Sequence, residues 1–532
     1  MASTPEPALL QRRPSMRRDL PQLADRQFDV LVVGGGVQGA TIAWDASLRG
    51  LSVALVDQSD FGSGTSANSL RIVHGGLRYL SRADFPRMRE SIRERGALLR
   101  IAPDLVEPLP VLVPTSRNSP VHSRFAFALG LAANDLVSWN RNRGIEAHRH
   151  LPRSRLVSRA ECLRQFPWFA GERLTGGAIW YDARLRQPHR LTLSFVCSAS
   201  RQGAVPANYV RVDGLLTGKA GVEGAAVTDI IGGKAFEIRA RAVVVAAGPW
   251  TNGVIASTLP HRQPKVGPTK AFALNVVLGR RLSEVAVGVQ SQRPAGRAPE
   301  SGGNRFLFIH PQAKSTLLGT WYSVSERQEV TDLCTRGAHE LLDEVNAACH
   351  GLSLSPADIV RYQWGWLPLK AGREAGSPLE LAERPLIVDH GSANGIRHLF
   401  SVEGVKYTTA RAVAERVVDQ VARDLGASAA ACRTAETRLV ESKAALDLYS
   451  DGAMNRATIL RAIREEMALK LSDIVLRRYD GGVLPALPRR LVAEVAEVAS
   501  SELGWTAEQQ LSEIEEVLRQ ANSAPTVMEP TG

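Results

Sequence analysis

The first strong pattern in the chain is a short run of apolar, β-branched residues that leads into three consecutive glycines. Residues 30–33 form this run, and residues 34–36 are the glycines. A continuous apolar run of this length before a turn is typical of a buried parallel strand. Residues 41–48 then have helical character, with Gly50 in the position of a C-terminal cap, and residues 53–56 form a second apolar strand. The pattern predicts a strand–helix–strand unit with parallel strands.

Further along the chain, two zones have strand character and the last zone has helical character. Residues 204–247 contain several apolar, β-branched runs, the last of which ends before Gly248. Residues 306–320 contain two short runs that we expect to be strands of a separate sheet. Residues 444–520 are dominated by good helix formers and have few strand signals. The pattern therefore predicts an α/β protein with more than one sheet and a helical C-terminal region.

Size and composition indicate a globular protein with more than one domain. The 532 residues exceed what one hydrophobic core needs, and 44% are hydrophobic and 22% charged, which excludes a collagen-like or disordered chain. Residues 1–27, rich in Pro, Arg and Ser, are predicted to be a flexible tail without a secretory signal. The longest apolar run, residues 125–133, is too short to span a bilayer. We expect a soluble or peripheral protein.

Charge and cysteine content narrow the range of partners. The formal charge of +11, from 65 basic and 54 acidic residues, would suit an anionic membrane surface, nucleic acid or an anionic substrate. Nucleic acid is disfavoured, because the chain has no zinc-ligand spacing, basic helix or aromatic RNA-binding signature. The five cysteines are scattered, without a CxxC pair. They indicate reduced thiols in a cytoplasmic protein and predict no metal site.

The strongest chemical signal is a glycine fingerprint between the first strand and the first helix. Gly34, Gly36 and Gly39 have the spacing Gly-x-Gly-x-x-Gly, and Asp57 follows the second strand. The first glycine permits the tight turn, the second lets the backbone approach a pyrophosphate, and the third allows close helix–strand packing. The helix N-terminus attracts phosphate, and the acid can accept a hydrogen bond from a ribose hydroxyl. This context predicts a dinucleotide cofactor.

Several longer motifs resemble one family of flavoproteins. Residues 62–66, Gly-Ser-Gly-Thr-Ser, and residues 71–80, Arg-Ile-Val-His-Gly-Gly-Leu-Arg-Tyr-Leu, resemble the signature of FAD-dependent, quinone-linked glycerol-3-phosphate dehydrogenases. These enzymes belong to the wider D-amino-acid-oxidase-like group. The resemblance extends from about residue 16 to residue 520 and includes segments 181–183, 246–250, 404–409, Arg411, 464–468, Asp473, 477–478 and 503–505.

The resemblance implies an α/β fold class and a bound FAD. It implies a Rossmann-like FAD-binding domain interleaved with an α+β substrate domain over residues 28–425, and a C-terminal helical domain over residues 440–525. The residues that it places at the FAD are Gly34, Gly36, Gly39, Asp57, Thr65, Ser66, Gly248, Gly404, Lys406 and Thr408.

Four residues are the candidates for substrate chemistry. His74 could take the hydroxyl proton of an alcohol near neutral pH, or be a structural histidine beside a glycine turn. Arg78 could bind a phosphate through two hydrogen bonds, or form a surface ion pair. Lys406 could hold a phosphate or the electron-rich edge of the flavin, or be a solvated loop lysine. Tyr79 could contact substrate or pack in the core.

The substrate side departs from the family in two places. Where relatives carry a Ser-Lys-Gly-x-His motif, the chain reads Thr-Lys-Ala-Phe-Ala, so Ala273 replaces the family histidine. Where relatives carry Gly-x-Arg-Pro, the chain reads Gly-Trp-Leu-Pro, so Leu367 replaces an arginine that lines the substrate site. Lys370 and Arg373 follow closely and could compensate for the lost arginine.

The resemblance implies an enzyme that oxidises sn-glycerol 3-phosphate, or a closely related phosphorylated polyol, to the ketone by hydride transfer to FAD. Quinone is the expected electron acceptor. The alternative is an FAD-dependent oxidase of a different alcohol or amine that returns electrons to oxygen, which peroxide production would reveal.

A membrane partner is a separate expectation. Residues 125–139 are largely apolar and flanked by Arg124, Arg141 and Arg143. This segment could lie at a membrane interface, where quinone is reached, or pack as an ordinary helix on the substrate domain. We expect a cytoplasmic protein with peripheral contact to the cytoplasmic membrane, and a homodimer as its assembly.

Overall fold

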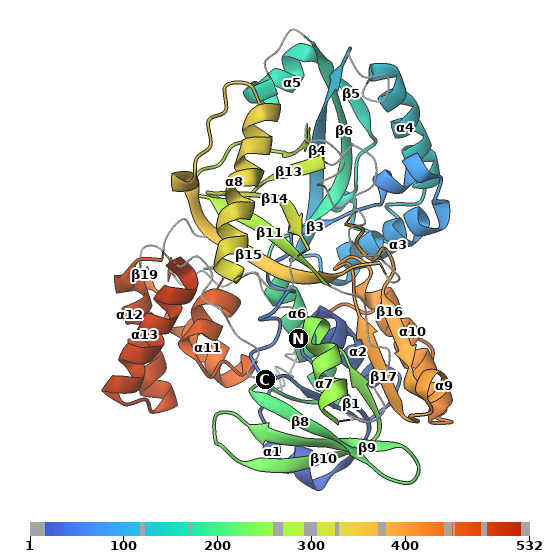
Figure 1. The fold of residues 1–532 in the computed structure, drawn as a ribbon, viewed down its shortest axis with the longest axis vertical. Coiled ribbons are helices and arrows are strands. Elements are labelled where there is room, and N and C mark those ends of the chain that lie inside the picture. Colours follow the sequence, from blue (N-terminus) through green and yellow to red (C-terminus); the bar gives the residue numbers. More distant parts are fainter. Residues whose placement is uncertain are drawn as a thin grey trace, which may run out of the picture.

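The computed structural model describes residues 16–117, 123–169, 173–258, 270–291, 306–324, 329–370, 379–440, 449–450, 453–479 and 487–522. Figure 1 shows a lower part built on one sheet, an upper part built on a second sheet, and a group of C-terminal helices, drawn in red, at one side. The chain passes back and forth between the sheets: segments 27–56, 205–245 and 386–403 contribute to the first, and segments 72–185 and 270–368 to the second. The predicted α/β architecture with two interleaved domains is confirmed.

The first sheet has the strand order β16-β17-β10-β1-β2-β7, and β10 also continues into an antiparallel ribbon with β9 and β8. Its strands are β1 (Gln27–Val33), β2 (Val53–Val56), β7 (Val205–Ala207), β8 (Val210–Thr217), β9 (Val222–Asp229), β10 (Ala235–Val245), β16 (Leu386–Asp389) and β17 (Leu399–Glu403). β1 is parallel to β2 and β10, and β10 is parallel to β17. The strands predicted at residues 30–33 and 53–56 are confirmed. Because these strands are parallel, their carboxyl ends meet at one edge of the sheet.

Helices cover both faces of the first sheet (Figure 1). α2 (Val37–Leu48) is buried along nearly its whole length, because it lies on the sheet and packs against α6 (Pro188–Arg201) and α10 (Ala410–Asp424). Apolar side chains of these helices and of the strands form one core. Alternate strand residues form a second core on the other face, with α1 (Leu20–Asp25) and α7 (Thr251–Thr258).

The N-terminal segment corrects one prediction. The flexible tail expected over residues 1–27 is wrong for residues 16–27, which are ordered; residues 1–15 lie outside the described part of the chain. Met16 and Leu23 are buried in the two cores of the first domain. Arg18 forms an ion pair with Asp229. Two apolar anchors and one buried ion pair therefore hold a segment whose overall composition is that of a disordered chain.

The second sheet is mostly antiparallel and has the strand order β15-β11-β14-β13-β12-β4-β6-β3, with β5 paired to β6. Its strands are β3 (Ile72–Val73), β4 (Val106–Ser116), β5 (Arg155–Ser158), β6 (Leu174–Leu185), β11 (Lys270–Leu278), β12 (Ala286–Gln290), β13 (Phe306–Pro311), β14 (Thr316–Ser323) and β15 (Ile359–Pro368). The helices around it are α3 (Phe85–Ile101), α4 (Arg124–Val137), α5 (Arg159–Gln165) and α8 (Val330–Ala348). β13 and β14 confirm the two strands predicted in residues 306–320, in a sheet separate from the first.

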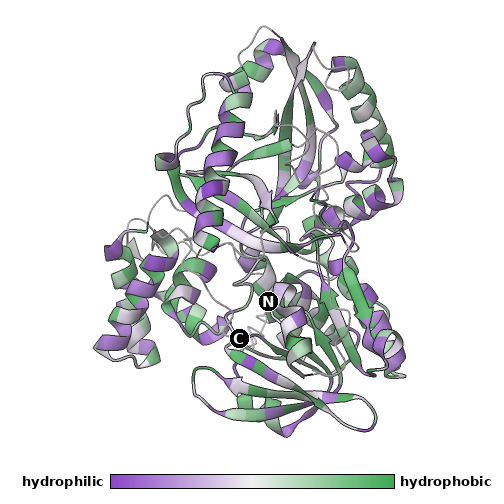
Figure 2. Cartoon of the chain, viewed as in Figure 1, coloured by the Kyte–Doolittle hydropathy of each residue, from purple (hydrophilic) through white to green (hydrophobic). Residues whose placement is uncertain are grey.

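The C-terminal part is a small helical unit with its own core. It contains α11 (Arg456–Glu466), a π-helix (Asp473–Arg478), α12 (Arg489–Leu503) and α13 (Ala507–Asn522), which pack around apolar side chains. Figure 2 shows both polar and apolar residues on these helices, whereas strands of the first sheet are largely apolar. The helical prediction for this region is confirmed for the described residues, apart from two two-residue strands, β18 (Tyr449–Ser450) and β19 (Ala453–Met454).

Candidate active site

The glycine turn between β1 and α2 has the geometry that a dinucleotide fingerprint requires. Gly34 has φ +105°, a left-handed conformation that would strain any other residue, and its amide donates to the Val56 carbonyl oxygen at 2.8 Å. A Cβ at Gly39 would collide with the Gly34 carbonyl oxygen, so glycine lets α2 pack closely on the turn. Among the described residues, only the Ser66 hydroxyl oxygen, at 3.2 Å, would contact a Cβ at Gly36. The outer side of the turn is therefore open to a ligand.

The carboxyl edge of the first sheet gathers the other residues predicted at the cofactor. Asp57 directly follows β2, Gly404 directly follows β17, and Gly248 follows three residues after β10. Gly404 lies close to α2, since a Cβ there would collide with the Gln38 side chain. Thr408, in the segment between β17 and α10, is buried. The parallel strands thus bring residues from four parts of the sequence to one edge.

The side chains of Asp57 and Ser66 hold the glycine turn through hydrogen bonds to its backbone amides. Asp57 accepts hydrogen bonds from the Gly35 amide at 2.6 Å and the Ser59 amide at 2.8 Å. Burial raises the pKa of Asp57 to about 6, against the opposing effect of these two amides. The Ser66 hydroxyl oxygen accepts from the Val37 amide, the first of α2, at 2.9 Å. Both residues hold the turn in the shape that a pyrophosphate needs.

The residues at this edge fit FAD. The open side of the turn at Gly36 would be filled by a Cβ, the N-terminus of α2 carries partial positive charge, and Asp57 offers carboxylate oxygens at the end of β2. This set of groups suits the pyrophosphate and ribose of a dinucleotide. Ser66 and Gly34 shape the same turn, and Gly248 and Gly404 complete the edge.

Three cations surround the buried ring of Tyr79. Tyr79 lies in a short 3-10 helix (Leu77–Arg82) that follows β3. The guanidinium carbons of Arg78 and Arg87 lie 5.2 and 5.0 Å from the ring centroid, and Lys406 Nζ lies 4.7 Å from it. Lys406 also donates a hydrogen bond to the Tyr79 hydroxyl. The fold thus joins Arg78, Tyr79 and Lys406, although Lys406 is 327 residues from Tyr79 in the sequence.

The cluster perturbs the pKa of its own members. Burial alone would raise the pKa of Tyr79, but Arg78 and Lys406 outweigh it, and the pKa of Tyr79 is lowered. Burial lowers the pKa of Lys406, with a further contribution from the neighbouring arginines and opposition from Tyr79. A bound anion would relieve this repulsion between cations, so the cluster is suited to a negatively charged ligand.

His74 stands next to this cluster, directly after β3. Its ring lies 6.1 Å from the Tyr79 ring, edge to face. Burial lowers the pKa of His74 well below its ordinary value of 6.5, and the charges of Arg78 and Lys406 lower it further. Its Nδ1 atom is buried without a hydrogen-bond partner among the described residues. A neutral imidazole can accept a proton from a substrate.

Asp182 and its partner Arg95 hold the turn after His74. Asp182 lies in the motif 181–183 noted in the sequence, whereas Arg95 was not predicted. Asp182, on β6, accepts from the Gly75 amide at 2.5 Å and from Arg95 Nη1 at 2.9 Å. Trp180 Nε1 donates to the other carboxylate oxygen of Asp182 at 3.1 Å. Asp182 belongs to a family motif, but its partner Arg95 lies 87 residues away on α3, so no local signal could reveal the pair.

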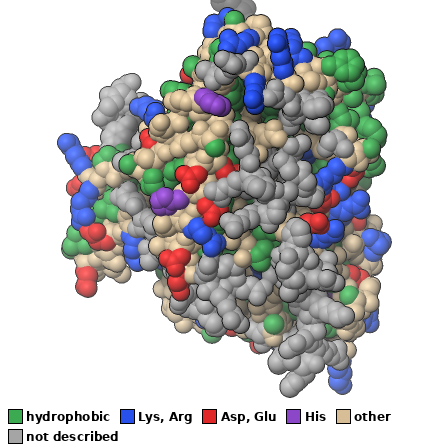
Figure 3. Space-filling model, turned by 45° about the horizontal axis from the view of Figure 1, so that its top comes forward, with side chains coloured by type: hydrophobic (Ala, Val, Ile, Leu, Met, Phe, Trp, Pro, Cys, Tyr) green, Lys and Arg blue, Asp and Glu red, His purple; other side chains and the backbone are tan. Residues whose placement is uncertain are grey.

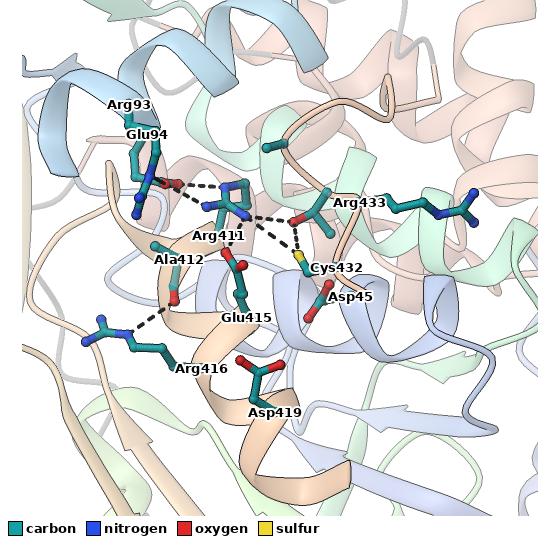
Figure 4. A network of polar contacts seen from close by, with 12 residues as sticks. Asp45, Arg93, Glu94, Arg411, Ala412, Glu415, Arg416, Asp419, Cys432 and Arg433 are labelled. Atoms are coloured by element: carbon teal, nitrogen blue, oxygen red, sulfur yellow. Dashed lines mark hydrogen bonds and ion pairs between the residues drawn. The ribbon is translucent and has the colours of Figure 1, made fainter. Parts of the chain in front are cut away.

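A buried ion pair, drawn in Figure 4, lies close in sequence to the Lys406 segment. Arg411, at the start of α10, donates to both carboxylate oxygens of Glu94 on α3, at 2.7 and 2.6 Å. Arg411 also donates to Glu415 at 2.9 Å and to the Thr434 hydroxyl at 3.1 Å. The pair ties α10 to α3, the helix that follows Tyr79. It therefore fixes the two segments that carry Lys406 and Tyr79 relative to each other.

A buried carboxyl group at the cofactor edge was also not predicted. Glu403, the last residue of β17, is buried, and neither carboxylate oxygen has a hydrogen-bond partner among the described residues. Burial raises its pKa, and the charge of Lys270 opposes this. Lys270 donates to the Pro249 carbonyl oxygen, beside Gly248. Only the fold brings Glu403 and Lys270 together, because they lie on strands of different sheets.

The two positions that depart from the family share one face of the second sheet. Gly365 of β15 packs on Thr65, since a Cβ there would lie 3.0 Å from the Thr65 side chain. Ala273 is the cross-strand partner of Gly365, and Leu367 lies two residues further along β15. All three therefore face the first domain. On this face stand Ala273 and Leu367, where the family resemblance leads us to expect a histidine and an arginine.

Of the two cations proposed to compensate, the structure describes Lys370. Lys370 has 68% of its side chain exposed and donates to Glu380 at 2.9 Å, on the surface of the protein. Its cation is therefore engaged away from the cluster around Tyr79. Arg373 lies outside the described residues.

Comparisons with known proteins give one consistent result. The model of the FAD dependent oxidoreductase family matches residues 29–420, and the model of the C-terminal domain of alpha-glycerophosphate oxidase matches residues 406–510. A solved glycerol-3-phosphate dehydrogenase from Bacillus halodurans, complexed with FAD, has a TM-score of 0.70 at 23% identity, over 97% of this chain and 100% of that chain. At this level of identity, the likeness shows a shared fold.

Two sequence relatives carry the same name. A glycerol-3-phosphate dehydrogenase of Synechocystis sp. is 32% identical over 453 residues, which cover 82% of this chain and 78% of that protein. The mitochondrial glycerol-3-phosphate dehydrogenase of Mus musculus is 30% identical over 426 residues, which cover 77% of this chain and 54% of that protein. The chain thus spans about half the length of this mitochondrial relative. The chain belongs to the FAD-dependent oxidoreductases, as a flavoenzyme of the glycerol-3-phosphate dehydrogenase family with FAD as its cofactor.

Proposed function

We propose that this flavoenzyme oxidises sn-glycerol 3-phosphate, or a closely related phosphorylated polyol, to the corresponding ketone and passes the electrons to a quinone. The observation that supports the proposal best is the cluster of Arg78, Tyr79 and Lys406 beside a neutral His74. Lys406 lies between β17 and α10, so this cluster borders the edge where the cofactor residues gather. The names of the Synechocystis and mouse relatives point to the same substrate.

In such a reaction, each residue of the cluster around Tyr79 and the neighbouring His74 has a separate role. Bound FAD supplies the acceptor for a hydride from the carbinol carbon. Arg78 and Lys406 bind the phosphate, for which a planar guanidinium and a compact ammonium are complementary donors. His74 takes the hydroxyl proton on its neutral imidazole. Tyr79 orients Lys406 through its hydroxyl, and its buried ring spaces the three cations.

A basic groove next to the cluster also favours an anionic substrate. A cavity of about 930 Å³ lies between α3, the turn after α4 and the start of α10, and Lys406 lines one part of it. The cations in its lining are Arg87, Arg89, Arg93, Arg100, Arg141, Arg143, Arg384, Lys406 and Arg416, and the acids are Glu90, Glu383 and Glu436. Nine cations against three carboxylates create a positive potential that attracts anions.

The altered face of the second sheet supports the second candidate, an oxidase of a less charged alcohol or amine. Leu367 and Ala273 offer no hydrogen bond to a phosphate oxygen, and a leucine cannot solvate an anion. Oxygen would then be the electron acceptor. The retained Arg78 and Lys406 favour the first candidate.

Anaerobic bleaching of the bound flavin distinguishes the two. We expect sn-glycerol 3-phosphate to bleach the flavin much faster than glycerol, and a soluble quinone analogue to restore its colour. Under air, we expect little hydrogen peroxide per substrate oxidised. Bleaching by an uncharged alcohol or an amine alone, with one peroxide formed per turnover, would establish the oxidase and contradict the dehydrogenase.

Contact with a membrane, where quinones dissolve, is supported by α4. Phe125, Leu129 and Leu136 of this helix, and Trp139 just after it, have 74, 58, 75 and 77% of their surface exposed. Leu131, on the opposite side of α4, is buried against the second sheet. In Figure 3, apolar side chains gather at the upper right, over the part of the molecule that holds α4. No helix among the described residues is long and apolar enough to cross a bilayer. We propose peripheral attachment through this apolar face, next to the arginines of the basic groove.

A further inference from the structure

We propose that the C-terminal helical unit has a function in cofactor binding: its Arg477 and Arg478 hold the loop that supports the ribose and pyrophosphate ends of FAD, so that docking of the unit and binding of FAD reinforce each other. This inference rests on FAD as the cofactor and is independent of the identity of the substrate. Neither the family description of the C-terminal domain nor the chemistry of the active site assigns these arginines a role.

The loop in question connects the two parts of the dinucleotide site. It runs from Asp57, after β2, to Gly62. The Gly62 amide donates to the Gly35 carbonyl oxygen at 3.0 Å, and the ring of Phe61 would collide with a Cβ at Gly35. The loop therefore packs directly on the glycine turn. A shift of the loop would move both Asp57 and that turn.

Asp60, in the middle of the loop, points away from the glycine turn into the C-terminal unit and is completely buried. Its Oδ2 atom accepts from Arg477 Nε at 2.9 Å and from Arg478 Nη1, and its Oδ1 atom accepts from Arg478 Nη2 at 3.0 Å. Asn208, after β7, donates to Oδ1 at 3.0 Å. These donors lower the pKa of Asp60 in spite of its burial. Asp60 is therefore an anion held almost entirely by the C-terminal arginines.

Each arginine is in turn held by a second acceptor in the C-terminal unit. Arg477 Nη2 donates to Asp473 at 2.6 Å, and Arg478 Nη2 donates to the Glu466 carbonyl oxygen at 2.7 Å. Asp473 also accepts from the Tyr209 hydroxyl at 2.7 Å. The Tyr209 amide donates to the Ser59 carbonyl oxygen at 3.3 Å, so this contact leads back to the same loop.

A third ion pair closes the network around the other side of the loop. Arg190, on α6, donates to both carboxylate oxygens of Glu466, at 2.5 and 3.0 Å. Thr192, two residues further along α6, would lie 3.2 Å from a Cβ at Gly62. Three buried carboxylates, of Asp60, Asp473 and Glu466, thus face the guanidinium groups of Arg190, Arg477 and Arg478, and the less buried Arg461 adds a fourth guanidinium 3.3 Å from Glu466.

The balance of charge explains why a change in this network should alter the conformation of the loop as well as the stability of the protein. Removing one member leaves a buried charge without its partner, and the neighbouring segment must move to solvate that charge. The segment that can move is the loop at Asp60, which is also the support of the cofactor turn. Binding of FAD and docking of the C-terminal unit both favour the ordered loop. By thermodynamic linkage, docking therefore tightens FAD binding, and bound FAD stabilises docking by the same free energy.

Reconstitution of the apoprotein with FAD tests the proposal. We expect Asp60→Asn and Arg477→Lys each to raise the Kd for FAD at least tenfold, while the KM for substrate at saturating FAD stays within twofold of wild type. The control is Arg464→Gln, which breaks an exposed ion pair with Glu502 inside the same helical unit and should leave the Kd unchanged. Binding is measured by flavin fluorescence at a temperature where circular dichroism shows a folded apoprotein.

The result that would overturn the proposal is a Kd within threefold of wild type in the folded variants. If Asp60→Asn does not fold, Arg477→Lys decides, because it leaves the paired contacts of Arg478 in place and removes the guanidinium that joins Asp60 to Asp473 through two nitrogens. Hydrogen exchange gives the reciprocal test in the unmodified protein. FAD should slow amide exchange in residues 466–478, and exchange that is unaffected by FAD would refute the linkage, since a merely structural contact does not respond to the cofactor.

Discussion

At the scale of single residues, the substrate proposal depends on the cations around Tyr79. Arg78 and Arg87 lie at nearly the same distance from the ring, yet their surroundings differ. Arg87 is paired with Asp84 at 2.7 Å and with Glu383 at 2.6 Å, so its charge is largely balanced by carboxylates. Arg78 is an exposed neighbour of Lys406, whose own charge repels it. The place of Arg78 beside Lys406, where two cations can share one phosphate, makes it our candidate for the phosphate partner.

Replacing Arg78 by alanine should weaken the use of an anionic substrate much more than it weakens FAD retention. Loss of a charge-assisted, hydrogen-bonded contact of this kind costs about 2–5 kcal/mol, or roughly thirty-fold to several thousand-fold in kcat/KM. Steady-state kinetics and the flavin content of the purified variant measure both quantities. Arg87→Ala is the matched control and should have a smaller effect. Equal efficiency of Arg78→Ala and wild type would show that Arg78 does not touch the substrate.

The state of His74 predicts how substrate oxidation depends on pH. Because burial and two cations lower its pKa well below 6.5, the imidazole is neutral in the free enzyme at pH 6.5 and above. A neutral base stays available, so the rate of flavin reduction should be flat between pH 6.5 and 8 and fall only at lower pH. Rapid-mixing measurements across this range provide the test. A rate that falls with decreasing pH through the region near 6.5 would mean that His74 titrates normally or is not the base.

Sequence patterns revealed the residues of the site that lie in local motifs and missed those paired across the fold. Gly34 and Asp57 could be predicted because strand, turn and helix follow one another along the chain. The pairing of Asp182 with Arg95 could not, because it depends on how β6 and α3 pack together. The same reason hides the contact between Asp60 and Arg478, which are 418 residues apart.

At the scale of secondary structure, the connection between α3 and α10 positions the two halves of the substrate site. Arg411 and Glu94 are both buried, and their paired hydrogen bonds join the helices that adjoin Lys406 and Tyr79. A buried pair of this kind is worth little relative to an apolar pair but is costly to break on one side.

Arg411→Met should therefore reduce the free energy of unfolding by about 3–5 kcal/mol, since it leaves the buried Glu94 carboxylate with a long contact, 3.3 Å, to the exposed Arg93 in place of its two short ones. Denaturant unfolding with saturating FAD, followed by circular dichroism, measures this change. The double variant Arg411→Met with Glu94→Leu should recover part of the loss, because it removes the stranded charge. A loss below about 1 kcal/mol in the single variant would contradict the importance of this connection.

We predict that the exposed apolar face of α4 as a whole, and not one side chain, binds the membrane. The double variant Leu136→Glu with Trp139→Glu should lose co-sedimentation with anionic phospholipid vesicles and keep its flavin, because both side chains are largely exposed. Leu511→Glu, on an exposed position of α13, is the control and should bind like wild type. Unchanged binding of the double variant would exclude α4 as the attachment site.

Helices and strands could be predicted where the hydrophobic pattern was strong. They could not be predicted where tertiary packing orders a segment whose composition is that of a flexible tail. β1 and β2 follow from continuous apolar runs that only a buried parallel strand can accommodate. The helix α1 did not follow from the sequence, because its segment has the composition of a tail and is held by the distant Asp229 and by two apolar anchors. For α4, the sequence indicated an apolar helix but not which face is covered, which depends on how the helix lies on β5 and β6.

At the scale of the whole molecule, the chain alternates between the two sheets, and this places one face of the second sheet, the substrate wall, over the carboxyl edge of the first sheet. β11 and β15 end the second sheet, and the face that carries Ala273 and Leu367 is turned toward Thr65 of the first domain. The order of strands in this sheet could not be derived from the sequence, because neighbouring strands such as β4 and β12 are far apart in the chain. The family motifs nevertheless indicated that this wall had changed.

The central claim is that the enzyme reduces its flavin with sn-glycerol 3-phosphate in spite of the altered wall. The most direct test is the anaerobic rate of flavin reduction by this substrate in the wild type and in Leu367→Arg. We predict fast, saturable reduction in the wild type that depends on Arg78 and Lys406, with at most a modest gain in Leu367→Arg. Negligible reduction in the wild type that Leu367→Arg rescues would mean that the site serves another ligand. Negligible reduction in both proteins would contradict glycerol 3-phosphate as the substrate.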